Sequence, residues 1–461
     1  MTHWISTNEI RSRFSALMSD MYQNEVPLYG DLIDLVKDIN QSTLEQQPTL
    51  HSQLQHTGEL PRLSQERHGA IRLGTAAELN NMRRVFAVMG MHPVGYYDLV
   101  PSGVPVHSTA FRAIETADLN QCPFRVFTSL LRLELIADEQ LRTLAEQALA
   151  KRQIFSDKAL ALTAKFEQNG GLVEADAQDF VQEVLETFRW HTDAPVSKSL
   201  YQALHDQHRL IADVVAFKGP HINHLTPRTL DIDAVQHNML ARGIPAKAIV
   251  EGPPRRQCPI LLRQTSFKAL QENVNFADAD QLAQGSHTAR FGEIEQRGVA
   301  LTPKGRARYD QLLQQARSLL GRSPDDSNAV EYVRILEQTF QAFPDTYADL
   351  QAEGLAYFYY FVNATAASKA AHTWTTADVA TLLANGSLSI EPIVYEDFLP
   401  VSAAGIFQSN LGEANQTDYA SVSNQALFEQ SLGAQVHDEM QLYQSLEQQS
   451  LAACLAQLNK Q

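Results

Sequence analysis

Two stretches of the chain present the same order of predicted elements, and this repetition constrains the fold more than any other sequence feature. The first stretch begins at His68-Gly-Ala-Ile-Arg72 and the second at His224-Leu-Thr-Pro-Arg228, so each starts with a His-x-x-x-Arg motif. In both, a strand-like start is followed by an amphipathic helical segment that ends at a glycine, and then by three strand-like runs. Each stretch therefore reads as strand, helix, strand, strand, strand.

The predicted boundaries follow from the spacing of the apolar residues. The first stretch has a predicted helix over 77–89 and predicted strands over 93–100, 104–114 and 124–136. The second has a predicted helix over 233–242 and predicted strands over 246–250, 260–267 and 290–302. Two such modules can pair their sheets around one enclosed site. Chance recurrence is the alternative, because this order of elements is common and the chain contains 15 histidines.

The charge balance limits the partners that the chain can have. Lys and Arg total 37 against 53 Asp and Glu, which gives a formal net charge of −16. A chain this acidic repels nucleic acid backbones and anionic lipid surfaces, so neither is an expected partner. An acidic substrate would need arginines within a pocket to overcome this field. We therefore expect a small-molecule substrate that binds in a pocket.

Cysteine usage and hydropathy indicate the compartment. Cys122, Cys258 and Cys454 are far apart and odd in number, so they suggest neither a disulfide framework nor a CxxC metal site. No segment approaches the ~18 apolar residues that a membrane span requires, and the first residues lack a signal-peptide pattern. We expect a cytoplasmic protein without membrane contact. The sequence carries no signal for the oligomeric state.

Side chains with metal-binding chemistry gather on the predicted strands. Residues two apart in a strand share a face, so His68 and Arg72 would line one cavity, with His224 at the matching place in the second module. The last strand of that module places Glu293 and Glu295 on one face. Burying a carboxylate is costly unless a cation pairs with it. Two imidazoles and one carboxylate form the facial triad that suits iron(II) and leaves positions open for a chelating substrate.

The sequence pattern also allows other roles for these residues. His221 competes with His224 for the ligand role, since only three residues separate them. Glu293 and Glu295 could instead form a solvated strand face that pairs with Arg297. A single histidine is more often a hydrogen-bonded structural residue than a ligand. The argument for a metal therefore rests on the set and on its repeated spacing.

We predict an α+β fold in which paired βαβββ modules form a metal-enclosing sheet or half-barrel, surrounded by helical segments. The sequence also favours helices in the first 60 residues, in 137–216 and in the C-terminal stretch 426–458. The predicted divisions are N-terminal helices over 1–60, the first module over 61–136, a helical insertion over 137–216, the second module over 217–302, and a helical or mixed region over 303–461 that closes the site.

The motifs resemble those of a known enzyme family. The strand Phe-Gly-Glu293-Ile-Glu-Gln296-Arg297 is similar to the strand that supplies the glutamate ligand in 4-hydroxyphenylpyruvate dioxygenase, a member of the vicinal oxygen chelate superfamily. That match selects Glu293 over Glu295. Throughout its length the chain more closely resembles the 2-oxoadipate dioxygenase/decarboxylase family, also called hydroxyglutarate synthase. The segments that carry this resemblance are 66–72, 221–228, 290–298 and 398–403.

The resemblance implies a reaction and a set of site residues. It implies that His68, His224 and Glu293 bind Fe(2+), and that His68, Arg72, Val401 and Ser402 contact the substrate, with Arg72 as the catalytic residue that pairs with a substrate carboxylate. The implied reaction converts 2-oxoadipate and dioxygen to 2-hydroxyglutarate and carbon dioxide, in lysine catabolism.

Two other functions compete with this reading. A zinc- or nickel-dependent lyase or isomerase of the glyoxalase type would use the same ligands without dioxygen, because two histidines and a glutamate also serve zinc. Consumption of dioxygen distinguishes the two enzymes. A metal-free binding protein of the same fold is the third hypothesis, and the match around Glu293 argues against it.

Overall fold

A curled seven-stranded sheet forms the half-barrel at the centre of the molecule. The computed structural model describes residues 3–277, 282–288, 290–363, 373–399 and 424–460. The strands of the central sheet are β1 (Arg67–Leu73), β2 (His92–Asp98), β3 (Val106–Arg112), β4 (Arg125–Leu131), β6 (His224–Pro227), β7 (Leu262–Ser266) and β10 (Phe291–Arg297). Their order across the sheet is β2-β3-β4-β1-β6-β10-β7. The predicted α+β class and half-barrel are therefore confirmed.

The first module has the predicted order of elements. Helix α4 (Ala76–Val88) follows β1, and the antiparallel strands β2, β3 and β4 come next. The side chain of Thr75 accepts a hydrogen bond from the amide of Glu78 and so caps the start of the helix. Gly90 follows the helix with φ +65°, a conformation that glycine adopts without strain.

The second module departs from the prediction in two places. Helix α11 (Ile232–Ala241) follows β6 as expected, but 246–250 is not a regular strand and forms only isolated bridges, such as Ala246 with Phe267. Pro245 and the Gly252-Pro-Pro turn flank this segment, and proline cannot donate a ladder hydrogen bond. The prediction also missed a hairpin before β10, formed by β8 (Gln271–Ala277) and β9 (Leu282–Thr288), which pairs with β5 (Asp193–Ala194) in a separate sheet.

The two modules join through their first strands. Strands β1 and β6 pair in antiparallel fashion, with His68 opposite Thr226. Strand β1 is flanked by β4, and β6 is flanked by β10, so each first strand pairs in parallel with the last strand of its own module. The predicted ligand residues therefore lie on three adjacent strands in the middle of the sheet.

The two faces of the sheet contact different hydrophobic cores. Ala70 and Phe127 pack into one core, whereas Ile71 and Val126 pack into the other. This alternation confirms that His68, Ala70 and Arg72 share a face, which we call the His68 face. On the opposite face, a Cβ atom at Gly69 would lie only 2.5 Å from Cδ1 of Ile222, so the close packing there requires glycine.

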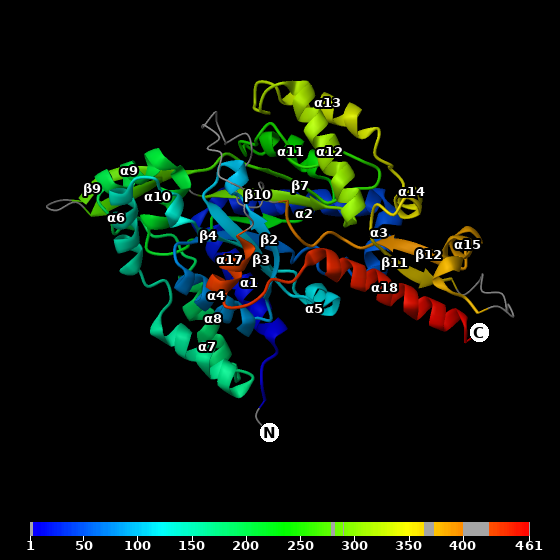
Figure 1. The fold of residues 1–461 in the computed structure, drawn as a ribbon, viewed down its shortest axis with the longest axis horizontal. Helices are drawn as coiled ribbons and strands as arrows, with labels where there is room; N and C mark the ends of the chain where they lie inside the picture. Colours follow the sequence, from blue (N-terminus) through cyan, green and yellow to red (C-terminus); the bar gives the residue numbers. More distant parts are fainter. Residues whose placement is uncertain (1–2, 278–281, 289, 364–372, 400–423, 461) are drawn as a thin grey trace.

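Helices cover both faces of the sheet (Figure 1). The core opposite the His68 face is closed mainly by α1 (Thr7–Glu25), α2 (Pro27–Gln46), α4, α7 (Asp157–Asn169), α8 (Glu174–Glu186), α11 and α17 (Gln425–Leu432). The core on the His68 face is closed mainly by α6 (Glu139–Ala150), α9 (Lys198–Gln207), α10 (Arg209–Val215), α12 (Pro303–Leu320) and α13 (Ala329–Phe340). The shorter helices are α3 (Pro48–His56), α5 (Thr116–Gln121), α14 (Tyr347–Ala352) and α15 (Val379–Ala384).

The C-terminal helix α18 (Glu439–Leu458) runs along a two-stranded sheet of β11 (Phe358–Val362) and β12 (Leu388–Pro392) (Figure 1). The amide of Phe358 donates to Oε1 of Glu447, and the amide of Tyr360 donates to Oγ of Ser450. These bonds satisfy donors at the edge of the small sheet. Among the described residues, no helix is both long enough and apolar enough to cross a membrane.

Candidate metal centre

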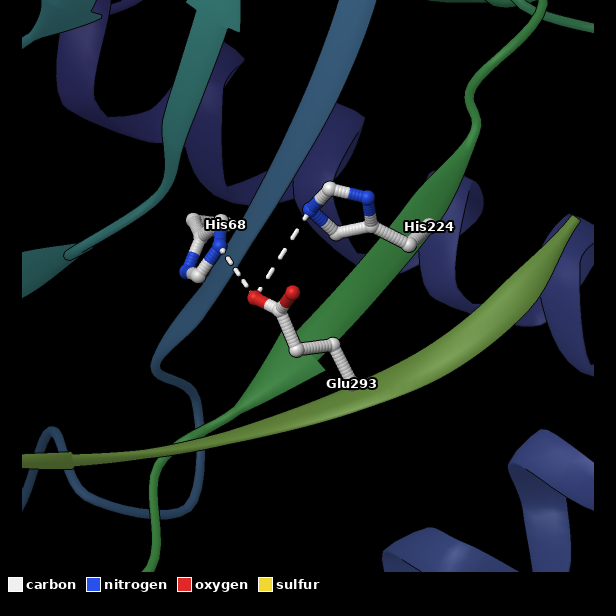
Figure 2. Close-up of side chains that lie close together, drawn as sticks. All are labelled: His68, His224 and Glu293. Carbon is white, nitrogen blue, oxygen red and sulfur yellow. Dashed lines mark ion pairs between the residues drawn. The ribbon is translucent and has the colours of Figure 1, made fainter. Parts of the chain in front are cut away.

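His68, His224 and Glu293 converge on one point from β1, β6 and β10. All three are fully buried, and one ligand atom from each lies within 4.8 Å of the others. Nε2 of His68 lies 3.2 Å from Oε1 of Glu293, and Nε2 of His224 lies 3.8 Å from the same oxygen. Figure 2 shows the three side chains pointing toward one another from neighbouring strands. This buried group could hold a metal ion.

The polar atoms of this group fit a cation. Within the described residues, Oε2 of Glu293 and both ring nitrogens of His224 are buried and make no hydrogen bond, whereas Nε2 of His68 faces Oε1 of Glu293 at 3.2 Å. Unpaired polar atoms in a protein interior are costly, and a metal ion would satisfy the carboxylate and one nitrogen of each histidine together. Neutral imidazoles and a carboxylate are the ligand types that divalent transition metals accept. The donor set therefore matches the predicted metal site.

Burial controls the protonation of the group in the absence of metal. Burial holds the pKa of His224 well below its ordinary value, and the nearby charges of His68 and Arg72 lower it further. Burial also raises the pKa of Glu293, which the contact with His68 partly offsets. At His68, burial lowers the pKa, but the carboxylates of Glu295 and Glu293 outweigh burial and raise it. A bound cation would favour the ionised carboxylate and neutral imidazoles that metal coordination requires.

Glu295 holds His68 from the side away from the three-residue group. Its Oε2 lies 2.9 Å from Nδ1 of His68, and Arg297 donates to both of its oxygens, from Nε at 2.8 Å and Nη2 at 2.9 Å. Burial alone would raise the pKa of Glu295, but Arg297 and His68 lower it to about 2. Glu295 is therefore an anion that orients the imidazole of His68 rather than a member of the group.

Glu293 is fixed by two hydrogen bonds to its Oε1. Thr226 Oγ1 donates at 3.1 Å and Gln264 Nε2 donates at 2.7 Å. Both residues lie on strands next to β10. The sequence reasoning missed both, although strand alternation places Thr226 on the same face as His224.

His221 lies apart from the candidate metal-binding group of His68, His224 and Glu293. Its Nε2 is 3.5 Å from Oδ1 of Asp213, and its ring packs edge-on against Trp190 at 4.7 Å between centroids. Burial lowers its pKa to about 3, so the ring is neutral. Within the described ranges, the group of mutually close ligand atoms contains His224 and not His221.

Arg72 is held by two acceptors on its Nη1. This atom donates to Oδ2 of Asp213 at 2.6 Å and to Oδ1 of Asn223 at 2.7 Å. Asn223 precedes His224 in the chain, so Arg72 is hydrogen-bonded to the residue next to a predicted metal ligand. The side chain of Arg72 is 12% exposed, and its charge contributes to the lowered pKa of His224.

Comparison with known proteins decides the family. The sequence profile of 2-oxoadipate dioxygenase/decarboxylase matches residues 14–410 of the chain. The chain belongs to this family. A 2-oxoadipate dioxygenase/decarboxylase of Pseudomonas putida is 60% identical over 456 residues, covering 99% of this chain and 98% of that protein. The enzyme of the same name from Escherichia coli is 54% identical over 454 residues, covering 98% and 99%.

A solved structure of the family matches the whole chain. The crystal structure of hydroxyglutarate synthase from Pseudomonas putida in complex with 2-oxoadipate superposes with a TM-score of 0.91 at 58% identity, covering 100% of both chains. The family resemblance and the fold inferred from the sequence are both confirmed by these comparisons.

Two of the substrate residues implied by the family resemblance, Val401 and Ser402, lie outside the described residues. The described chain reaches this segment from Phe398, whose ring packs edge-on against His68 at 4.9 Å between centroids. The guanidinium carbon of Arg297 lies over the Phe398 ring, 5.4 Å from its centroid. Phe398, three residues before Val401 in the chain, therefore lies beside the buried group of His68, His224 and Glu293.

The sequence analysis did not predict a buried network of charged side chains around Glu66. Glu66 accepts hydrogen bonds from Arg62 at 3.2 Å, Arg125 at 2.8 Å and Arg228 at 3.1 Å. These arginines keep the pKa of Glu66 well below its ordinary value despite burial. Arg228, the second arginine of the repeated motif, thus binds a structural carboxylate, whereas Arg72 binds Asp213. The repeat preserves the fold of the modules but not the role of this arginine.

Proposed function

We propose that this chain oxidatively decarboxylates 2-oxoadipate with dioxygen to give 2-hydroxyglutarate and carbon dioxide. One observation carries the proposal: a buried group of two histidines and one glutamate occupies the sheet of a chain that is homologous along its whole length to an enzyme crystallised with 2-oxoadipate. The reaction is balanced, because both atoms of dioxygen and all atoms of the substrate appear in the two products.

The proposed metal is ferrous iron, held by His68, His224 and Glu293. A facial set of two histidines and one carboxylate leaves coordination positions for a bidentate substrate and for dioxygen. Bound ferrous iron would supply the activation of dioxygen that side chains alone cannot provide. Glu295 would keep His68 in one orientation, and Thr226 and Gln264 would do the same for Glu293.

Arg72 is the proposed substrate-binding arginine. Its planar guanidinium can bind a carboxylate through two parallel hydrogen bonds, which suits a diacid substrate. We also propose that His68 contacts the substrate and that Val401 and Ser402 bind the other end of it. The full burial of the three ligand side chains favours exclusion of water from the reacting atoms.

We also propose that the reaction belongs to lysine breakdown, which the family resemblance supports, and that the protein works in the cytoplasm. All three cysteines are free and buried, which agrees with a reducing compartment.

The test compares two metals on the same protein. Protein loaded anaerobically with ferrous iron is expected to consume dioxygen when 2-oxoadipate is added, with release of carbon dioxide and formation of 2-hydroxyglutarate. Zinc-loaded protein is expected to consume none. Conversion of a 2-oxo acid by the zinc or nickel form without dioxygen uptake would instead support the lyase or isomerase of the glyoxalase type.

A further inference from the structure

A series of three buried side chains leads from Arg72 into the neighbouring segments outside the central sheet. Oδ2 of Asp213 accepts from Nη1 of Arg72 at 2.6 Å, and Oδ1 of Asp213 lies 2.9 Å from Nε2 of His287. Nδ1 of His287 lies 2.9 Å from the hydroxyl of Tyr201. Asp213 belongs to α10, His287 to β9 and Tyr201 to α9. Through Asp213, three elements outside the central sheet are therefore linked to Arg72.

The groups that hold Asp213 are themselves fixed in place. Asp213 is an anion, because the charge of Arg72 and the hydrogen bond from His287 outweigh burial and keep the pKa of its carboxyl well below the ordinary value. His287 therefore donates from Nε2 to Asp213, and its Nδ1 is paired with the hydroxyl of Tyr201. The ring of His287 is also fixed by packing, since it stacks on Trp190 at 6.2 Å with an interplanar angle of 5°. Asp213 is thus held in place by side chains from β9 and α9, which lie outside the central sheet.

The arrangement fixes the guanidinium of Arg72 before any substrate arrives. Asp213 and Asn223 both bind the same nitrogen, Nη1, and their separate positions define the plane of the fork. Asn223 is anchored in turn, because its backbone amide and its Nδ2 both donate to the carbonyl of Ala70. A side chain that is oriented in advance loses less entropy when it binds a carboxylate and places that carboxylate in one position.

We propose that Asp213, held by His287 and Tyr201, is a positioning residue that orients Arg72 toward a carboxylate of the 2-oxo diacid substrate. The proposal rests on the proposed function, since it assigns Asp213 to the site in which that reaction takes place. It also gives α9, α10 and the β8–β9 hairpin a role beyond covering the sheet. Asp213 itself need not touch the substrate.

The substitution Asp213→Asn distinguishes positioning from simple charge neutralisation. Removal of the negative charge makes the electrostatic potential around Arg72 more positive, so electrostatics alone predicts tighter binding of a dianion. Loss of orientation predicts the opposite, a fall in kcat/KM of about 10–100-fold, because the charge-assisted hydrogen bond is lost. The two effects differ in sign, and the sign of the change is therefore diagnostic.

A second variant keeps the test decisive if Asp213→Asn does not fold. Tyr201→Phe removes only the hydroxyl that fixes His287 and is expected to lower kcat/KM by about 2–10-fold. Tyr360→Phe is the matched control, because Tyr360 is equally buried and its hydroxyl accepts one hydrogen bond, from Gln351, in the small C-terminal sheet. The control variant should keep the wild-type kcat/KM.

The experiment measures kcat and KM for 2-oxoadipate, iron content, and the anaerobic Kd of 2-oxoadipate by calorimetry. The proposal is supported if Asp213→Asn and Tyr201→Phe keep their iron but lose kcat/KM, and if Asp213→Asn causes no further loss in an Arg72→Ala background. It is overturned if the wild type turns over 2-oxoadipate while both variants keep its kcat/KM, or if Asp213→Asn only tightens the anaerobic Kd. In those cases the proposed function stands. Absence of dioxygen uptake by the iron-loaded wild type would overturn the proposed function, and this inference with it.

Discussion

Nδ1 of His68 lies 2.9 Å from Oε2 of Glu295, while Nε2 of the same ring faces Glu293 at 3.2 Å. The imidazole therefore has a carboxylate on each side, and only one of them belongs to the metal-binding group. A carboxylate on the far nitrogen fixes the ring and raises its basicity as a ligand. Arg297 keeps Glu295 ionised, so the orientation of His68 depends on a chain of charged side chains.

Glu295→Gln tests this contact. The amide keeps the size of the side chain but removes the charge, so we expect metal affinity to fall by about 10–100-fold while the three ligands stay in place. Metal retained against a chelator series is the measurement. Glu391→Gln is the matched control, because Glu391 also lies near a histidine, with its Oε1 3.7 Å from Nδ1 of His56, but outside the site. Equal metal retention by both variants would show that the Glu295 contact does not support the ligand.

His224→Ala and His221→Ala separate the two candidate histidines. Loss of His224 removes one of three ligands and is expected to abolish stoichiometric iron binding. His221→Ala should keep the iron, since His221 lies beside Asp213 rather than in the group. Iron content per chain after anaerobic loading and desalting gives the answer. The reverse pattern would move the ligand role to His221.

Arg72→Ala should damage substrate binding without removing the metal. Loss of a charge-assisted carboxylate contact is expected to lower kcat/KM for 2-oxoadipate by roughly 10–100-fold or more. Iron content should stay near that of the wild type, because Arg72 is not a ligand. Arg72→Lys should restore only part of the activity, since an ammonium group lacks the planar fork. A variant that loses its iron would show that Arg72 is structural.

The buried group of His68, His224 and Glu293, which could hold a metal ion, could be predicted from the sequence because its placement depends on the alternation of side chains along strands. Strand alternation places His68 and Arg72 on one face, and the match around Glu293 identifies the strand that supplies the carboxylate. The same alternation could not choose between Glu293 and Glu295, which share a face. Their different roles depend on which carboxylate reaches Nε2 of His68 and which reaches Nδ1, and that distance exists only in the folded sheet.

The side chains that hold Arg72 could not be predicted from the sequence. Asp213 and His287 are far from Arg72 in the chain and lie in segments whose apolar spacing indicates only a covering helix or gives little signal. The hairpin with His287 was missed because its strands are largely polar and partly exposed. Buried polar contacts between distant segments have no periodic signature in a sequence, unlike the apolar faces of helices and strands.

Stability should depend on pH through Glu439 at the start of α18. Burial and the nearby charge of Asp397 raise the pKa of Glu439 to about 7. The native state then holds a proton that the unfolded chain releases near its ordinary carboxyl pKa, so stability decreases as pH rises from about 4.5 to 7. Glu439→Gln removes this dependence.

We expect Glu439→Gln to raise the Tm by about 1–2 °C at pH 8 and to have little effect at pH 5. Melting of both proteins by circular dichroism at the two pH values is the measurement. An equal change in Tm at both pH values would contradict the assignment of this proton to Glu439.

The most direct test of the proposed reaction follows the oxygen atoms. Iron-loaded protein is supplied with 2-oxoadipate under isotopically labelled dioxygen, and the organic product is analysed by mass. The proposed reaction predicts 2-hydroxyglutarate in which the new hydroxyl and the new carboxylate each carry a labelled oxygen, with one carbon dioxide released per substrate. An unlabelled product, or a product that retains all six substrate carbons, would contradict oxidative decarboxylation at this site.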